Sequence, residues 1–279
     1  MTGKTKNKAN PIRCWPVILL LSALILSGCR FNYQTLEFQR AEEAAEKQQF
    51  TKALKHFDRA VKSRPRTEIA LEAARRGSRI AHLETAEFIT AISFYRHLIL
   101  YSSDEVERID AQKKIASVYF EKISDYASAI REYSRLLYLP HSKDEEKFFR
   151  FNIAKSYFYL NNFYQASSEI KDLLKLVSDD EDKFEYLAFR GNILLTTKKL
   201  EEATDIFIDL MKNYPEESLR ENVPLSLAVA YEEKGEFDRA VAVLEKVKKT
   251  HPSPEFIELR IKRLRERIEN LPGAKGLTK

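Results

Sequence analysis

The feature of this chain that most constrains its fold is a set of six alanines at nearly constant spacing. The alanines are Ala53, Ala91, Ala129, Ala166, Ala203 and Ala240. Successive members are separated by 38, 38, 37, 37 and 37 residues. A period of this length is typical of an array of small repeated units, in which each unit buries its apolar face by packing on the next.

Each alanine lies at the same place in a pattern of larger apolar residues. Three residues before the alanines stand Phe50, Phe88, Tyr126, Phe163, Leu200 and Phe237. Four residues after them stand Phe57, Tyr95, Tyr133, Ile170, Phe207 and Leu244, and a further apolar residue follows three positions later. Side chains at i, i+4 and i+7 share one face of a helix. The pattern therefore predicts one helix around each alanine, with its apolar face in the core.

A partner helix is predicted upstream of each alanine. Twelve residues before the alanines stand Ala41, Arg79, Ser117, Ala154, Gly191 and Ala228. Most of these residues are small, and a small side chain allows two helices to approach closely. Proline ends three units in phase, at Pro65, Pro215 and Pro252, because it lacks the N–H that would continue a helix. The sequence thus predicts an all-α array of about six helix-turn-helix repeats.

The order small residue, aromatic, alanine, aromatic, proline resembles the tetratricopeptide repeat, or TPR, over about residues 34–253. The resemblance implies an α-solenoid that binds other proteins in a concave groove lined by the first helix of each repeat. The units here are a few residues longer than the usual ~34. An irregular helical bundle is the alternative, but it does not account for six copies in phase.

The chain begins with a segment that has the features of an export signal. Its basic residues are Lys4, Lys6, Lys8 and Arg13. The ten-residue apolar run 17–26 follows, too short for a bilayer that requires ~20 residues. The run ends in Leu-Ser-Gly-Cys at 26–29, which resembles the lipobox of bacterial lipoproteins. An uncleaved signal anchor and an ordinary secretory signal are the alternatives.

The lipobox implies that residues 1–28 are removed and that Cys29 carries a covalent lipid. Residues 29–33 would then form a lipidated tether that holds the first repeat close to the membrane. Arg30 follows the cysteine, where an aspartate would favour the inner membrane, so the expected location is the periplasmic face of the outer membrane. Loss of residues 1–28 lowers the net charge from +5 to +1, which leaves no electrostatic footprint for nucleic acid.

The C-terminal residues depart from the repeat pattern. Residues 254–271 predict one more helix, with Ile257, Ile261, Leu264, Ile268 and Leu271 on a single face. An apolar inner face and a charged outer face are what the last helix of a repeat array needs, so this segment is expected to be a capping helix. Residues 272–279 contain Pro272 and two glycines and are predicted to form a disordered tail.

The TPR resemblance also implies which residues face a partner. Its repeat phase places the following residues in the groove: Ile80 and Leu83 from the second repeat, Val118 from the third, and Phe148, Phe151, Lys155, Phe158 and Tyr159 from the fourth. Aromatic residues at helical spacing are more often core than surface. The aromatics of the fourth repeat therefore allow two interpretations, a binding surface or packing against a neighbouring repeat.

The sequence indicates a protein without catalytic, metal-binding or small-molecule sites. Only three glycines lie within the repeats, and no cysteine cluster or HExxH motif is present. We therefore expect no cofactor other than the lipid on Cys29.

The combination of a lipobox, a short tether and a long repeat is similar to the BamD-type lipoproteins of outer-membrane β-barrel assembly. The TPR pilotins of type IV pili and a peptidoglycan-enzyme adaptor are alternatives, and a hydrolase is the competing class. In each scaffold interpretation the partners are envelope proteins.

Overall fold

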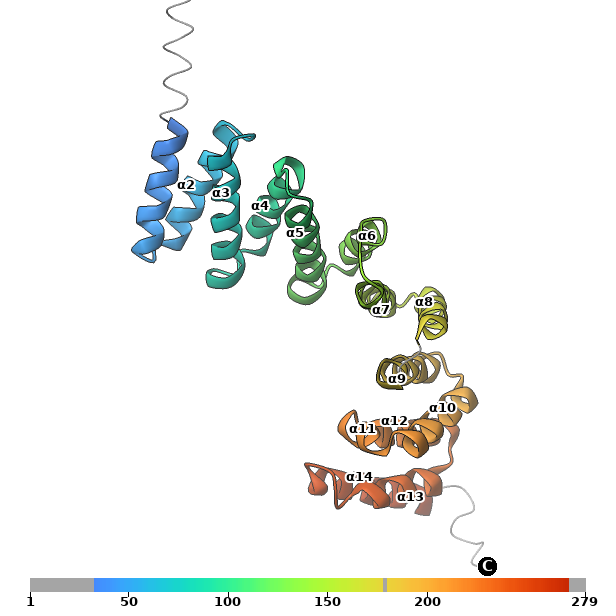
Figure 1. The fold of residues 1–279 in the computed structure, drawn as a ribbon. Coiled ribbons are helices and arrows are strands. Elements are labelled where there is room, and N and C mark those ends of the chain that lie inside the picture. Colours follow the sequence, from blue (N-terminus) through green and yellow to red (C-terminus); the bar gives the residue numbers. More distant parts are fainter. Residues whose placement is uncertain (1–32, 178–179, 271–279) are drawn as a thin grey trace, which may run out of the picture. The chain divides into compact units, whose positions relative to one another are not determined.

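A computed structural model describes residues 33–177 and 180–270, and every regular element in these ranges is a helix (Figure 1). The predicted signal peptide, the lipid site at Cys29 and the tail 272–279 lie outside the described residues. The chain divides into two compact units, residues 1–123 (unit 1) and 124–279 (unit 2).

Unit 1 consists of antiparallel helix pairs that lie side by side (Figure 1). Its elements are a helix over 33–46, α2 (Phe50–Ser63), α3 (Glu68–Arg79), η1 (Ile80–Glu84), α4 (Phe88–Tyr101), α5 (Glu105–Ser117) and η2 (Val118–Ile123). The two η elements are π-helical turns that continue α3 and α5 directly. The core of unit 1 contains Phe57, Phe94 and Tyr95, which pack around small residues such as Ala74.

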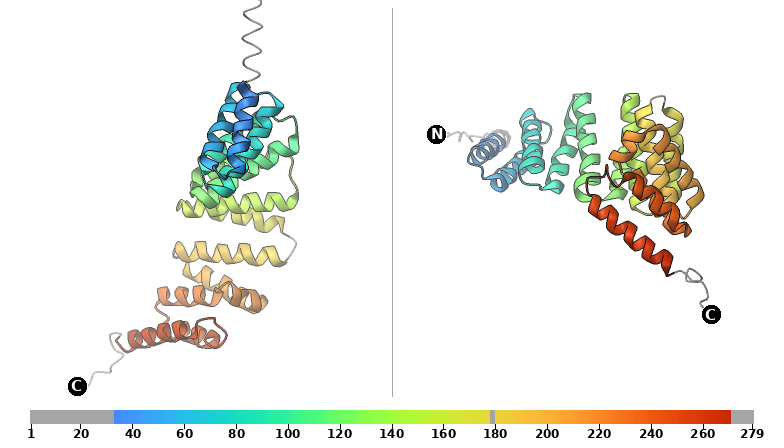
Figure 2. Two further views of the ribbon diagram at one scale, coloured as in Figure 1. Left: turned by 90° about the vertical axis from the view of Figure 1, so that its left-hand side faces the viewer. Right: turned by 90° about the horizontal axis from the view of Figure 1, so that it is seen from below.

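Unit 2 has the same kind of architecture, with its helices in successive layers (Figure 2). Its elements are α6 (Tyr126–Leu136), α7 (Lys143–Tyr159), α8 (Phe163–Leu176), α9 (Asp180–Thr196), α10 (Leu200–Asn213), α11 (Pro215–Arg220), α12 (Val223–Lys234), α13 (Phe237–Val247) and α14 (Pro254–Glu269). The capping helix predicted over 254–271 is α14. Its residues Ile257, Ile261 and Leu264 are buried in one core cluster with Leu244 of α13.

The helices predicted around the six alanines are α2, α4, α6, α8, α10 and α13. Each begins at the large apolar residue that stands three positions before its alanine. All six alanines are 0% exposed. Side chains this small let the two helices of a repeat pack closely, so the predicted all-α repeat fold and its register are confirmed.

The turn before each of these helices also repeats. Five residues before the alanines, the backbone adopts positive φ angles between 53° and 76°. The residues at this position are Gln48, Ala86, Ser124, Asn161, Lys198 and Gly235. Only the last is glycine, although a side chain in the left-handed region costs about 1 kcal/mol or more. The geometry of the helix pair therefore overrides the local preference in five of the six turns.

The π-helical turns explain why two of the repeats are longer. Both 38-residue intervals contain one, whereas α7 and α9 in the 37-residue intervals contain none. A π-helical turn closes through an i→i−5 bond, as from Thr85 N–H to the carbonyl of Ile80 at 3.2 Å, and so accommodates one extra residue. In both repeats the small buried residue therefore lies one position earlier than predicted. It is Ser78 in place of Arg79, which is exposed, and Ala116 in place of Ser117, which is half-buried.

The first helix of the sixth repeat is divided into α11 and α12. Asn222 between them has a left-handed backbone with φ of 56°, and Pro224 occupies the first turn of α12. Proline lacks the N–H that a continuous helix would require at this point, whereas it is well tolerated in a first turn. The sequence pattern predicted a first helix here but not the break.

No helix in residues 33–177 and 180–270 combines the length and apolar character needed to cross a membrane.

Candidate protein-binding groove

Unit 2 has a groove of about 800 Å³ between α7, α9 and the end of α11. Its lining consists of Phe151, Lys155, Phe158 and Tyr159 from α7, Asp182, Phe184, Glu185, Ala188, Phe189, Asn192, Leu195 and Thr196 from α9, and Arg220 and Glu221. The volume falls within the range of sites that hold small ligands or a few side chains of a peptide. Four of the five residues predicted in repeat four thus line one groove.

The wall of the groove is aromatic. The ring of Phe151 packs 4.8 Å from that of Tyr186 and 5.4 Å from that of Phe189, measured between ring centroids. Phe158 lies 5.3 Å from Phe189. Phe151 is only 6% exposed, whereas Phe158 is half-buried. The two interpretations of these aromatics therefore overlap, because the same rings hold α7 against α9 and line the groove.

Lys155 places a positive charge within this aromatic wall. Its Nζ lies 4.3 Å from the centroid of the Phe151 ring, a cation–π contact. Its side chain is half-buried, and the apolar stem contributes to the lining of the groove.

Acidic residues gather where α9 begins. Asp182 forms an ion pair with Lys147 of α7, and Glu221 lies 3.4 Å from the guanidinium of the adjacent Arg220. Glu185 is exposed at the groove, yet the packing around its carboxyl group raises its pKa above the ordinary value. The nearby charge of Lys155 opposes this rise only in part. Of the three carboxylates at this end of the groove, Asp182 and Glu221 are thus paired with basic side chains, whereas Glu185 forms no ion pair with any of the described residues.

Two of the residues predicted in repeat four, Tyr159 and Phe148, contact helix α6. Tyr159, 51% exposed, stacks on Tyr126 of α6 with the ring centroids 4.7 Å apart. Phe148 is 52% exposed but does not line the groove, and its ring lies 6.1 Å from those of Tyr133 and Phe149. Phe148 thus belongs to an aromatic cluster between α6 and α7.

The residues predicted in unit 1 do not form one site. Leu83, 67% exposed, lines a pocket of about 400 Å³ with His82 and Tyr95, and half-buried Ile80 lines a separate one of about 590 Å³. Val118 is 0% exposed and belongs to the core, so its assignment to the groove is wrong. Because the repeat contains one extra residue, Val118 is rotated by about 100° from the expected face, to the place that buried Ser156 holds in α7.

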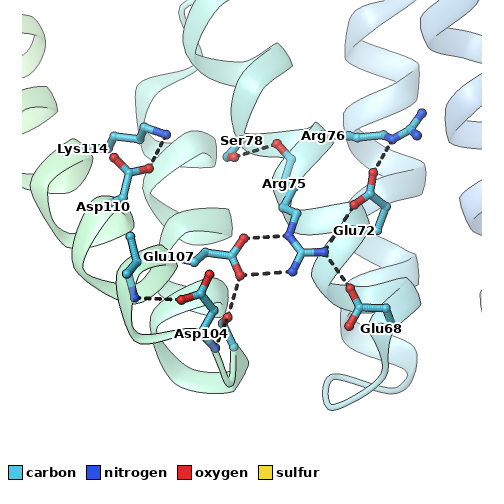
Figure 3. A network of polar contacts seen from close by, with 11 residues as sticks. Glu68, Glu72, Arg75, Arg76, Ser78, Asp104, Glu107, Asp110 and Lys114 are labelled. Carbon is cyan, nitrogen blue, oxygen red and sulfur yellow. Dashed lines mark hydrogen bonds and ion pairs between the residues drawn. The ribbon is translucent and has the colours of Figure 1, made fainter.

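The charged side chains of α3 and α5 in unit 1 neutralise one another (Figure 3). Arg75 Nε donates to Glu107 Oε1 at 2.6 Å and Nη2 donates to Oε2 at 3.1 Å, while Nη1 lies 2.7 Å from Glu68. Glu72 bonds Arg76, and Asp110 bonds Lys114. The hydrogen bond from Arg75 is the main cause that lowers the pKa of Glu107, against the opposing effect of burial. This network joins α3 to α5.

The groove residues on α9 are not among the predicted site residues, although the repeat itself contains the signal. Adding 37 to the predicted positions 148, 151, 155, 158 and 159 gives Glu185, Ala188, Asn192, Leu195 and Thr196. All five line the groove. The prediction included no residue of the fifth repeat, and these five residues are not aromatic.

Comparisons with known proteins point to one class of fold. A tetratricopeptide-repeat family model matches residues 225–254. No curated protein sequence matches the chain. Among solved structures, the C-terminal part of a TPR repeat-containing protein from Cytophaga hutchinsonii has a TM-score of 0.55 at 15% identity, over 83% of this chain and 89% of that one.

Two further structures share the fold. The type IV pilus biogenesis factor PilW has a TM-score of 0.52 at 14% identity, over 82% of this chain and 98% of its own. YrrB, described as a TPR protein with an unusual peptide-binding site, has a TM-score of 0.50 at 17% identity, over 74% and 97%. The chain therefore has the TPR fold.

Proposed function

We propose that this protein is a lipid-anchored scaffold on the periplasmic face of the outer membrane, and that the groove of unit 2 binds a segment of an envelope protein. The observation that carries the proposal is the aromatic groove between α7 and α9, since buried aromatics supply much of the affinity at protein interfaces. The lipobox at residues 26–29 supports the anchor and the location. Assembly of outer-membrane β-barrel proteins is the first candidate process.

Assembly of a type IV pilus is the second candidate. PilW, a type IV pilus biogenesis factor, shares the fold over 98% of its length. The two processes involve different partner proteins, so capture of the partner distinguishes them.

The partner can be captured by a photoreactive phenylalanine analogue incorporated at Tyr159 in living cells. Incorporation at Tyr164 is the matched control, because Tyr164 is 84% exposed but lies on α8 and does not line the groove. We expect the Tyr159 probe, and not the Tyr164 probe, to capture a β-barrel assembly protein or a secretin. Equal capture at both positions would show that the groove is not the binding surface.

The anchor has its own test. Cys29→Ala should abolish incorporation of radiolabelled fatty acid, because acylation requires the thiol. Label that persists in the variant would contradict lipidation at Cys29 and would leave the groove proposal untouched.

A further inference from the structure

The groove of unit 2 is polarised along its length. Asp182, Glu185 and Glu221 lie at the end where α9 begins, while Phe158 and Leu195 lie towards the ends of α7 and α9. One end thus offers carboxylates and the other offers an apolar surface. A ligand that occupies the whole groove must match both ends.

The carboxylates are not equally engaged within the chain. Asp182 is paired with Lys147, and Glu221 has Arg220 beside it. Across residues 33–177 and 180–270, Glu185 makes neither a hydrogen bond nor an ion pair. Glu185 is therefore the carboxylate that remains available to a ligand.

The carboxylates at the corresponding positions of unit 1 are paired, unlike Glu185. Allowing for the extra residue of each 38-residue repeat, Glu72 and Asp110 occupy the place of Glu185 in repeats two and three. Glu72 lies 2.8 Å from Arg76 Nε, and Asp110 lies 2.7 Å from Lys114 Nζ (Figure 3). Both are neutralised by a basic residue four positions later on the same helix. In α9 the residue four positions after Glu185 is Phe189, so an equivalent partner is missing from that helix.

Resting on the proposed function, we infer that the groove binds a short extended segment in which a Lys or Arg side chain meets Glu185 and an aromatic or branched aliphatic side chain packs against Phe158 and Leu195. Glu185 and Leu195 are ten residues apart on α9, a rise of ~15 Å. An extended chain covers that distance in about four or five residues at ~3.3 Å each. The two recognised side chains are therefore four or five positions apart.

Electrostatics favours a basic segment over an acidic one. An acidic side chain at this end would face the carboxylate of Glu185, whereas Asp182 and Glu221 are already paired with Lys147 and Arg220, and juxtaposed like charges disfavour binding. A Lys or Arg would form a charge-assisted hydrogen bond with Glu185, which is stronger than a neutral one. Burial is the main cause that raises the pKa of Glu185; the charges of Asp182 and Glu221 raise it further, and the charge of Lys155 opposes the rise.

The inference can be tested by selecting a random library of displayed 12-residue peptides on the purified full chain. We expect enrichment of peptides with Lys or Arg four or five positions from an aromatic or branched aliphatic residue. Selection on the Glu185→Lys variant should instead enrich Asp or Glu at that place. Enrichment of acidic peptides by the original chain, no enrichment at all, or the same preference on both chains would overturn the inference.

A selected peptide then allows the charged contact to be measured by fluorescence anisotropy. Glu185→Gln should weaken binding at least tenfold, while the control Glu202→Gln, on an exposed part of α10 outside the groove, should leave it unchanged. Melting curves of both variants check the fold. Unchanged binding by Glu185→Gln would overturn the inference.

A third variant separates this inference from the proposed function. Asn192→Trp fills the middle of the groove without removing a core residue, because Asn192 is exposed. If this variant abolishes binding and Glu185→Gln does not, the groove remains the binding site and only the charge recognition is wrong. If neither variant affects binding, both proposals fail.

Discussion

At the scale of single residues, this chain uses the same backbone conformation in chemically different turns. The left-handed residue five positions before each packing alanine is a glycine once, at Gly235, and a residue with a side chain elsewhere, as at Ala86. A Cβ at Gly235 would have no neighbouring atom within 4 Å, so its cost would lie in the backbone alone. The position thus isolates the cost of a left-handed residue from packing.

We predict that Gly235→Ala destabilises the protein by about 1 kcal/mol and that Ala86→Gly stabilises its repeat by a similar amount. In both variants the higher entropy of the unfolded chain with glycine offsets part of the backbone term. Hydrogen exchange of α12–α13 and of α4 provides the local measurement. The same sign of change in both variants would show that the turns are not governed by backbone strain.

Glu107 illustrates how one charged residue links the stability of unit 1 to pH. Its pKa in the folded chain is lower than the ordinary value of 4.5, chiefly because Arg75 donates to it. The folded state therefore binds its proton less readily than the unfolded state. The stabilisation from this carboxylate is present in full above pH ~4.5 and is lost as the pH falls through the lower folded value.

We expect Glu107→Gln to cost about 1 kcal/mol at pH 7, since the carboxylate is partly exposed, and to flatten the loss of stability in acid. Hydrogen exchange of α3 and α5 between pH 3.5 and 7, corrected for intrinsic exchange, measures both effects. Glu105→Gln serves as the control, because Glu105 is exposed at the start of the same helix. An equal response of both variants would show that the pair with Arg75 is not the cause.

At the scale of elements, the π-helical turns show how the array absorbs an extra residue. The helices on either side keep their register, and Ala91 and Ala129 remain fully buried. The extra residue changes which side chains face solvent within its own helix. It therefore affects the candidate binding surface more than the core.

Deletion of Leu83 should convert η1 into an α-helical turn and leave unit 1 folded, because the repeat then has the 37-residue length of the repeats in unit 2. Deletion of Leu195 should destabilise unit 2 strongly, since α9 has no extra residue to lose and α10 would be displaced from its register. Circular dichroism melting of both variants makes the comparison. A larger loss from the Leu83 deletion would contradict this role for η1.

At the scale of the whole molecule, helix pairs that contact mainly their neighbours provide the stability. In unit 2, α10 packs on α9 and α12, and α13 packs on α12 and α14. Apolar residues from these helices form one cluster, in which Ala203 and Ala240 are fully buried. Damage to one contact should therefore spread to adjacent repeats first.

We predict that Ala203→Leu costs roughly 1–3 kcal/mol, because Ala203 is 0% exposed and leaves no space for a larger side chain. Hydrogen exchange should accelerate in α9, α10 and α12 before it does so in α14. Glu202→Leu, at the neighbouring exposed position, is the control for the added side chain. An unchanged exchange pattern in Ala203→Leu would mean that this alanine does not lie at a tight helix contact.

The sequence by itself determined the helix pairs, the packing alanines and the capping helix. These features follow from apolar periodicity and from proline positions, and both act within about ten residues of the chain. The same periodicity contained the α9 side of the groove, since Glu185 and Asn192 repeat the positions of Phe148 and Lys155. The sequence also identified the residues of the lipobox, which remain a prediction because Cys29 lies outside the described residues.

Only the tertiary structure decided the surroundings of individual side chains. Val118 is buried because a π-helical turn rotates it into the core, and the energy of such a turn depends on the helices packed around it. Phe151 both packs on α9 and lines the groove because Tyr186 and Phe189 lie beside it. Glu107 is neutralised by Arg75, 32 residues earlier, while Glu185 has no such partner among the described residues. Burial and charge pairing are determined by contacts between helices far apart in sequence, which local periodicity does not specify.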